Sequence, residues 1–237
     1  MDRQHRRELK HDRFVDEIGV LSGRARENQR VLIGIAVAAL LVAVAVYGIY
    51  FYRSNRERKA QDMLATAIDT IESPLVVPTQ PNPDAKFKTD EEKNKAAEKQ
   101  FNDVKSKFRG TDAADVANVY LARIDAARGD TAGARKLLQA FVQDHPNHVL
   151  ARSARYSLYQ LRIEAGEAPQ VTNELTAELA KKEQDQVLPA DSLLVLLAHS
   201  YEVQGNDQKS RDTYRRIVTE FPDSPFALEA QRRVGPA

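Results

Sequence analysis

Three arginines and a tyrosine recur at helical spacing in the middle of the chain and carry its most distinctive chemistry. They lie three or four residues apart, so a helix would align them on one face. A row of guanidinium groups can bind an acidic peptide or the carboxylate of a chain end through paired hydrogen bonds. The alternative is a structural role, in which the arginines pair with acidic side chains of a neighbouring helix. The four residues are Arg152, Arg155, Tyr159 and Arg162.

Histidines and carboxylates do not form a recognisable catalytic or metal site. His145 and His148 have the spacing of one helical face, but Pro146 between them favours a turn. The chain has no cysteine, which excludes a thiolate zinc site and a cysteine nucleophile. There is no glycine-rich phosphate loop, no HExxH and no G-x-S-x-G motif. We therefore expect a protein that is not an enzyme and that uses no cofactor and no metal.

Composition favours an ordinary folded protein. Of 237 residues, 42% are hydrophobic and 29% are charged, with a net charge of +1. This mixture argues against a wholly disordered chain. A general nucleic-acid binder would carry a basic excess, which is absent here.

An uninterrupted apolar run occupies residues 31–52 and contains no charged side chain. As a helix it would be about 33 Å long, enough to cross a hydrocarbon core of about 30 Å. Aromatic residues at 50–52 stand where a signal peptide would need a cleavage site, and they suit a membrane interface. We predict a single uncleaved transmembrane helix rather than a buried core helix.

Basic residues flank this run on both sides and give the predicted orientation. The segment 1–30 holds eight basic side chains, and Arg53, Arg56, Arg58 and Lys59 follow the run. The short tail favours a cytoplasmic N-terminus, whereas the long remainder can cross the membrane regardless of its charge. We expect a cytoplasmic tail over 1–30 and a domain over 53–237 on the outer side. The tail is either an amphipathic helix on the membrane or a solvated charged segment.

The remainder of the chain repeats with a period of 37–38 residues. Arg109, Pro146 and Pro222 occupy equivalent places, separated by 37 residues and by two steps of 38. A further boundary is expected near Gln184. Such a period indicates a stack of helix pairs.

Within each period, apolar residues recur at i, i+3, i+4 and i+7, which predicts two one-sided helices. Gly129, Gly166 and Gly205 share the period, and each is expected to be the left-handed residue at a helix end. The first helices carry Ala60, Met63, Leu64 and Ala67; Ala117, Tyr120, Leu121 and Ile124; Ala154, Ser157, Leu158 and Leu161; and Leu194, Leu197, Ala198 and Tyr201. The second helices carry Ala97, Phe101, Val104 and Phe108; Ala134, Leu137, Leu138 and Phe141; Val171, Leu175 and Leu179; and Tyr214, Ile217, Val218 and Phe221.

Start signals and breakers complete the outline. Thr89 with Glu92 has the pattern of a capping box, and Asp130, Asn147 and Asn206 are expected N-caps. Four prolines make residues 73–88 a long loop, which is either a disordered excursion or a binding loop near the membrane. A last helix over 226–234 would cover the open face. The predicted fold is therefore all-α, a transmembrane helix followed by an α-solenoid of about four helix pairs.

The segment 193–224 resembles a tetratricopeptide repeat. Its period is 37–38 instead of 34, and the first unit lacks the closing proline. The resemblance covers about residues 56–234 and implies a domain that binds protein partners. The matching residues are Leu194, Leu197, Ala198 and Tyr201 in the first helix, Gly205 in the turn, and Ser210, Tyr214, Ile217 and Pro222 in the second half.

The order of tail, anchor and repeats resembles the family containing the ancillary subunit of the bacterial Sec translocon. This resemblance implies a chaperone-like interaction module that holds a partner protein or a translocating chain at the periplasmic face of the inner membrane. The ending Phe221–Pro225 is also similar to repeat proteins of outer-membrane assembly and cell division, so an envelope scaffold is an alternative. A cytoplasm-facing adaptor would require the reverse orientation.

On the template of this repeat, the first helices line an inner groove that would hold the partner. The predicted groove residues are Asp115, Asn118, Ala122 and Asp125; Arg152, Arg155, Tyr159 and Arg162; and Ser192, Val195, His199 and Glu202. The structural alternative pairs the three arginines with Asp115 and Asp125 across neighbouring units.

Overall fold

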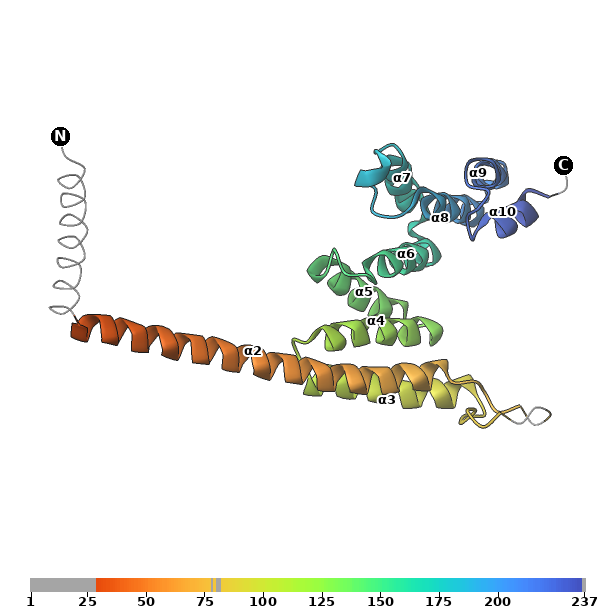
Figure 1. The fold of residues 1–237 in the computed structure, drawn as a ribbon. Coiled ribbons are helices and arrows are strands. Elements are labelled where there is room, and N and C mark those ends of the chain that lie inside the picture. Colours follow the sequence, from red (N-terminus) through yellow and green to blue (C-terminus); the bar gives the residue numbers. More distant parts are fainter. Residues whose placement is uncertain (1–28, 78, 80–81, 236–237) are drawn as a thin grey trace, which may run out of the picture. The chain divides into compact units, whose positions relative to one another are not determined.

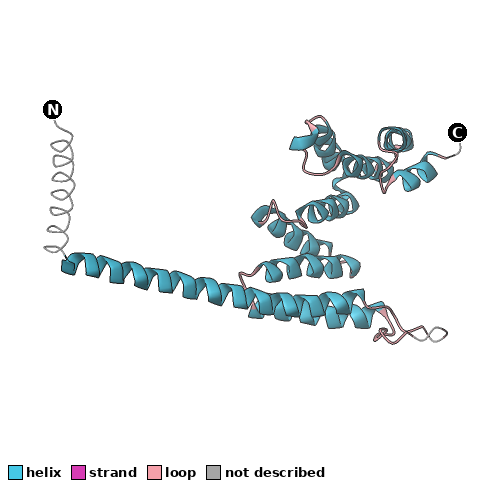
Figure 2. Ribbon diagram, viewed as in Figure 1, coloured by secondary structure: helices cyan, strands magenta, loops and turns pink. Residues whose placement is uncertain are grey.

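The computed structural model describes residues 29–77, 79 and 82–235, and this part of the chain is almost entirely helical (Figure 2). The predicted all-α fold with tetratricopeptide-like helix pairs is confirmed. The charged tail lies outside the described residues up to position 28. The elements are α2 (Gln29–Glu72), α3 (Asp90–Lys107), α4 (Asp112–Ala127), α5 (Thr131–Asp144), α6 (Ala151–Arg162), the wide turn η1 (Ile163–Glu167), α7 (Ala168–Leu179), the 3₁₀ turn η2 (Glu183–Asp185), α8 (Ala190–Val203), α9 (Asp207–Glu220) and α10 (Ala227–Val234).

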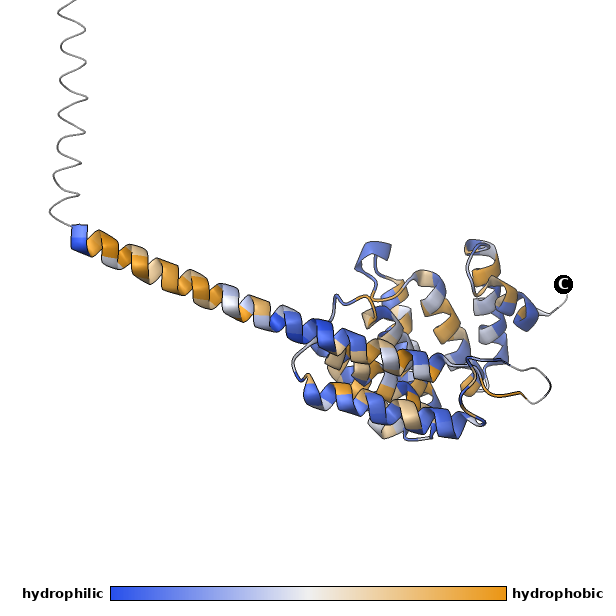
Figure 3. Ribbon diagram, turned by 60° about the horizontal axis from the view of Figure 1, so that its bottom comes forward, coloured by the Kyte–Doolittle hydropathy of each residue, from blue (hydrophilic) through white to orange (hydrophobic). Residues whose placement is uncertain are grey.

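The first compact unit of the chain ends at Arg56, and its described part is the apolar half of α2. Figure 3 shows this half of the helix as largely hydrophobic and then a hydrophilic stretch, after which the colours are mixed. Its apolar side chains are exposed along the whole stretch, and none of the most apolar 18-residue window is buried. A core helix of a soluble protein would be mostly covered. Helix α2 is long and apolar enough to cross a membrane.

The second unit begins at Glu57 and consists of successive helix pairs (Figure 1). The C-terminal part of α2 packs with α3, and the pairs α4 with α5, α6 with α7, and α8 with α9 follow. Gly129, Gly166 and Gly205 join the helices of the last three pairs with φ of 86°, 88° and 71°, a region that strains any residue with a Cβ atom. Their predicted role is confirmed. The boundary expected near Gln184 lies in η2.

Four apolar clusters follow one another along this unit, and each is shared by consecutive helices. The predicted one-sided helices therefore bury their apolar faces against the next pair, as in a solenoid. Representative buried members are Leu64, Phe101 and Leu121 for α2–α4; Leu138, Phe141 and Leu161 for α4–α6; Ile163, Leu175 and Leu196 for α6–α8; and Leu194, Ile217 and Ala230 for α8–α10.

Most predicted helix starts are correct, and one is wrong. Thr89, Asp130 and Asn206 each accept a hydrogen bond from the backbone N–H three residues on. Asn147 does not cap α6, because that helix begins four residues later at Ala151. The turn before α6 is longer than the cap pattern implies.

Residues 73–88 form a loop between α2 and α3. Its two ends meet in an isolated bridge between Leu75 and Phe87, where the N–H of Val76 donates to the carbonyl of Phe87 at 2.8 Å. Lys93 of α3 adds a contact to the carbonyl of Ser73. The base of the loop is thus tied together.

A fragment spanning residues 53–237 should fold without the apolar segment, because its stacked pairs complete their own clusters. Within it, Leu197 is 5% exposed, so Leu197→Ala should cost about 2–5 kcal/mol of unfolding free energy. Leu228 is 62% exposed on α10, so the matched control Leu228→Ala should change the unfolding free energy by less than about 0.5 kcal/mol. Circular dichroism and melting of the three proteins test this. A coil spectrum for the fragment, or equal melts for both variants, would contradict the architecture.

Candidate partner-binding surface

Arg162, at the C-terminal end of α6, binds two glutamates. Its Nε donates to Glu167 at 2.9 Å, and its two terminal nitrogens donate to the two oxygens of Glu174, each at 2.7 Å. Arg135 of α5 binds the other oxygen of Glu167 at 2.6 Å. Arg162 lowers the pKa of both glutamates through these hydrogen bonds. The four side chains form a charged network that joins α5, α6, η1 and α7.

The other members of the arginine–tyrosine row have different environments. Tyr159 is half-buried and packs against the α6–α8 cluster, and this burial raises the pKa of its hydroxyl. Arg155 donates to the carbonyl of Pro146 at 3.3 Å. Arg152 is exposed and makes no hydrogen bond or ion pair with any residue the structure describes. Helical spacing therefore predicted a common role for four side chains that have different contacts in the structure.

The predicted groove residues of α4 bind partners close to their own helix. Asp115 contacts His145 at 3.2 Å, and Asp125 contacts Arg128 at 3.4 Å. Burial raises the pKa of both aspartates. The amide oxygen of Asn118 is buried and has no hydrogen-bond partner among the described residues.

The predicted pairing of the three arginines with Asp115 and Asp125 across units is wrong. The backbones of α4 and α6 scarcely approach each other, whereas α5 packs closely against both. Glu174 of α7 instead presents both carboxylate oxygens to Arg162, and the planar guanidinium group favours such a two-point contact.

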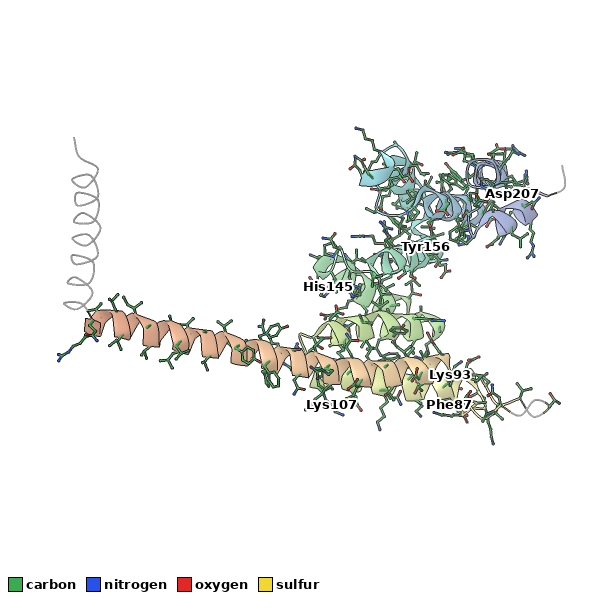
Figure 4. The ribbon with its side chains drawn as sticks, viewed as in Figure 1. Phe87, Lys93, Lys107, His145, Tyr156 and Asp207 are labelled. Atoms are coloured by element: carbon green, nitrogen blue, oxygen red, sulfur yellow. The ribbon has the colours of Figure 1, made fainter. Side chains whose placement is uncertain are left out.

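The two histidines lie in the turn between α5 and α6, as their spacing around a proline predicts. Figure 4 labels His145 there. His148 contacts Asp112 at 3.3 Å, and its Nδ1 accepts a hydrogen bond from the N–H of Leu150 at 3.1 Å.

The carboxylate of Glu57 accepts hydrogen bonds from the N–H groups of Asp112 and Ala113, so this α2 side chain caps the start of α4. Within the described ranges no three metal-binding side chains cluster.

Helix α10 contacts the predicted groove residues of α8. Glu202 binds Arg233 of α10 at 3.1 Å and lies 3.5 Å from His199. Val195 packs against the α8–α10 cluster. Tyr156 of α6, labelled in Figure 4, stacks on Phe226, the residue before α10, with ring centroids 6.1 Å apart. The last helix thus contacts the part of the groove that α8 would provide.

A hollow of about 480 Å³ lies between α4 and α6, and the groove template missed it. Its lining includes Val119, Ala122 and Arg123 from α4 and Ser157 and Leu161 from α6. Only Ala122 belongs to both this lining and the predicted groove. The signal that could have found the hollow is Ser157, a small polar residue at a position where the other units carry a large apolar one.

The charged network around Arg162 should stabilise the domain at neutral pH and not in acid. Because the folded state lowers the pKa of Glu167 and Glu174, their contribution is present above the unfolded value of about 4.3 and disappears as the pH falls through the lowered folded value. Arg162→Ala should lower the melting temperature at pH 7 by about 2–4 °C, and the gap to the parent should narrow below about pH 4. Arg152→Ala on the same helix is the control and should leave the melt unchanged. A gap that stays constant with pH would rule out the charged contribution.

Two family models match the chain. The model of a tetratricopeptide repeat-like domain matches residues 26–188, and that of a tetratricopeptide repeat matches residues 192–224. No curated protein matches the chain significantly. Tetratricopeptide repeats are in general non-enzymatic protein-interaction domains. The first match covers more than half of the chain and agrees with the helix pairs of the second unit, so the chain belongs to the tetratricopeptide repeat-like domain family.

Proposed function

We propose that this protein is a non-enzymatic interaction module anchored in the bacterial inner membrane. The repeat domain would hold a partner protein or a translocating chain at the periplasmic face. The observation that carries the proposal is the succession of an exposed apolar helix and a repeat domain of a protein-binding family in one chain. The apolar side chains at 31–52 need a lipid environment, because no described residue covers them.

The distribution of charge supports an outward-facing domain. Eight basic residues precede the apolar segment within 30 positions, and basic residues in a short tail favour its retention in the cytoplasm. We assign 1–30 to a cytoplasmic tail, 31–52 to the transmembrane helix and 53–237 to the repeat domain. In the order of these segments, the protein resembles the ancillary subunit of the Sec translocon.

Partner binding would use the inner side of the first helices. In the arginine–tyrosine row, Arg152 makes no ion pair or hydrogen bond with any described residue. Arg155 would lose only its one hydrogen bond to a backbone carbonyl on binding a partner. Both can therefore pair with acidic groups of a partner, whereas Arg162 is already bound at both ends of its guanidinium group. The arginines that would pair with acidic groups of a partner thus lie in the N-terminal half of α6.

Charges placed in the apolar segment should release the protein from the membrane. Each arginine at the centre of a transmembrane helix costs about 2.5–3.5 kcal/mol of insertion free energy. The double change Leu40→Arg and Leu41→Arg should move the chain from the carbonate-resistant membrane fraction to the soluble or degraded fraction. Leu228→Arg is the matched control, because Leu228 is as exposed as Leu40, at 62% and 63%. A parent protein found in the soluble fraction would contradict the anchor.

Orientation and partner class can be tested together in cells. Alkaline phosphatase fused after residue 237 should be active, because that enzyme needs the oxidising side of the membrane. Crosslinking of the full chain should then recover translocon components or chains in transit, and Arg152→Glu with Arg155→Glu should reduce that recovery. An inactive fusion would instead support a cytoplasm-facing adaptor. Recovery of cell-division or outer-membrane assembly proteins alone would support an envelope scaffold.

A further inference from the structure

The hollow between α4 and α6 arises where one unit lacks a packing side chain. At the equivalent position of the first helix, α8 carries Leu197, which is 5% exposed within an apolar cluster. Helix α4 carries Tyr120, whose ring stacks on Phe101 of α3 with centroids 5.0 Å apart and also lines the hollow. Helix α6 carries Ser157, which lines the hollow. The junction between the second and third pairs therefore has open space at the position where α8 carries a leucine.

The hollow has an apolar floor with charged side chains beside it. Its floor is apolar and covered, with Ala122, Leu138 and Ala154 each less than 5% exposed. Small side chains on both walls let another backbone approach closely. A volume of about 480 Å³ is within the range of ligand sites and about three times that of a cavity that binds benzene. It can accept one or two large apolar side chains.

Two opposite charges flank the floor on different walls. Arg123 projects from α4 and Glu164 from η1, and both line the hollow. Both are exposed, and neither forms an ion pair or hydrogen bond within the described part of the chain. The occupant that complements this arrangement carries an apolar centre, an acid on the Arg123 side and a base on the Glu164 side. A peptide segment carries all three on one chain.

We propose that the hollow between α4 and α6 is an insertion site for an amphipathic segment of a partner protein, whose apolar side chain enters it between an acidic residue at Arg123 and a basic residue at Glu164. The site rests on the proposed protein-interaction function and names the chemistry of the partner. It is separate from Arg152 and Arg155, which do not line the hollow.

A library of random 12-residue peptides displayed on phage, selected against the full chain in lipid nanodiscs, provides the probe. Selected peptides should share large apolar residues bracketed by an acid and a base. Ser157→Leu places an apolar side chain in the hollow, so it should raise the melting temperature by about 2–4 °C and weaken the selected peptide at least tenfold. This variant separates binding from folding, because a damaged fold would melt earlier.

Charge reversal tests the polarity of the site and remains decisive if Ser157→Leu does not fold. Arg123→Glu should weaken the selected peptide at least tenfold, and a peptide with lysine in place of its acid should regain affinity for that variant. Arg232→Glu, an exposed arginine of α10 outside the hollow, is the control and should bind as the parent does. Fluorescence anisotropy measures each affinity.

The outcomes distinguish this site from the proposed function. If peptides bind Ser157→Leu and Arg123→Glu as tightly as the parent, or if no peptide is enriched, the insertion site is overturned. The interaction function would still stand if crosslinking recovers partners of the full chain. If crosslinking finds no partner for the full chain, the interaction function itself fails.

Discussion

Each helix pair of the second unit buries its apolar faces against the elements before and after it in the stack, and the architecture depends on this stacking. Helix α8 illustrates the constraint, because Leu197 belongs to the cluster before it and Leu194 to the cluster after it. Stability in such a stack is close to a sum of local terms between neighbours. Each junction can therefore vary in its packing without disturbing the distant ones, and the last pair needs α10 to cover its open side.

The junction between α5 and α6 combines limited apolar packing with charge. Small residues such as Ala122, Ala134 and Ala154 make up much of its cluster. The ion-pair network of Arg162 and Arg135 with Glu167 and Glu174 spans the same junction on its polar side. Arginine suits this role because one planar group donates to two carboxylates at fixed angles. The pairs α4–α5 and α6–α7 are thus held together without close contact of their first helices.

Sequence periodicity was sufficient to predict the helix pairs, their glycine turns and most caps, because these depend on residues close together in the chain. It was insufficient for the partners of individual side chains. Arg162 has Asp115 and Asp125 at plausible template positions, yet it binds Glu174, because the distance between α4 and α6 is set by packing that no periodicity encodes. For the same reason, the capping of α4 by Glu57, 55 residues earlier, had no local signal. The groove template likewise carried no signal for the hollow between α4 and α6, of whose lining it named only Ala122.

Within this hollow one unit lacks a large side chain, at Ser157, and the cost of that absence is local. Burying a leucine side chain instead of a serine at position 157 would contribute about 1.5–3 kcal/mol if it were fully covered. The clusters on both sides of the junction are complete without it, since Phe101, Leu121, Ile163 and Leu175 are buried in their own sets. The unit therefore loses packing energy only where it gains an open apolar surface between Arg123 and Glu164. In a solenoid, a binding surface of this kind can exist at one junction because the neighbouring junctions maintain the fold.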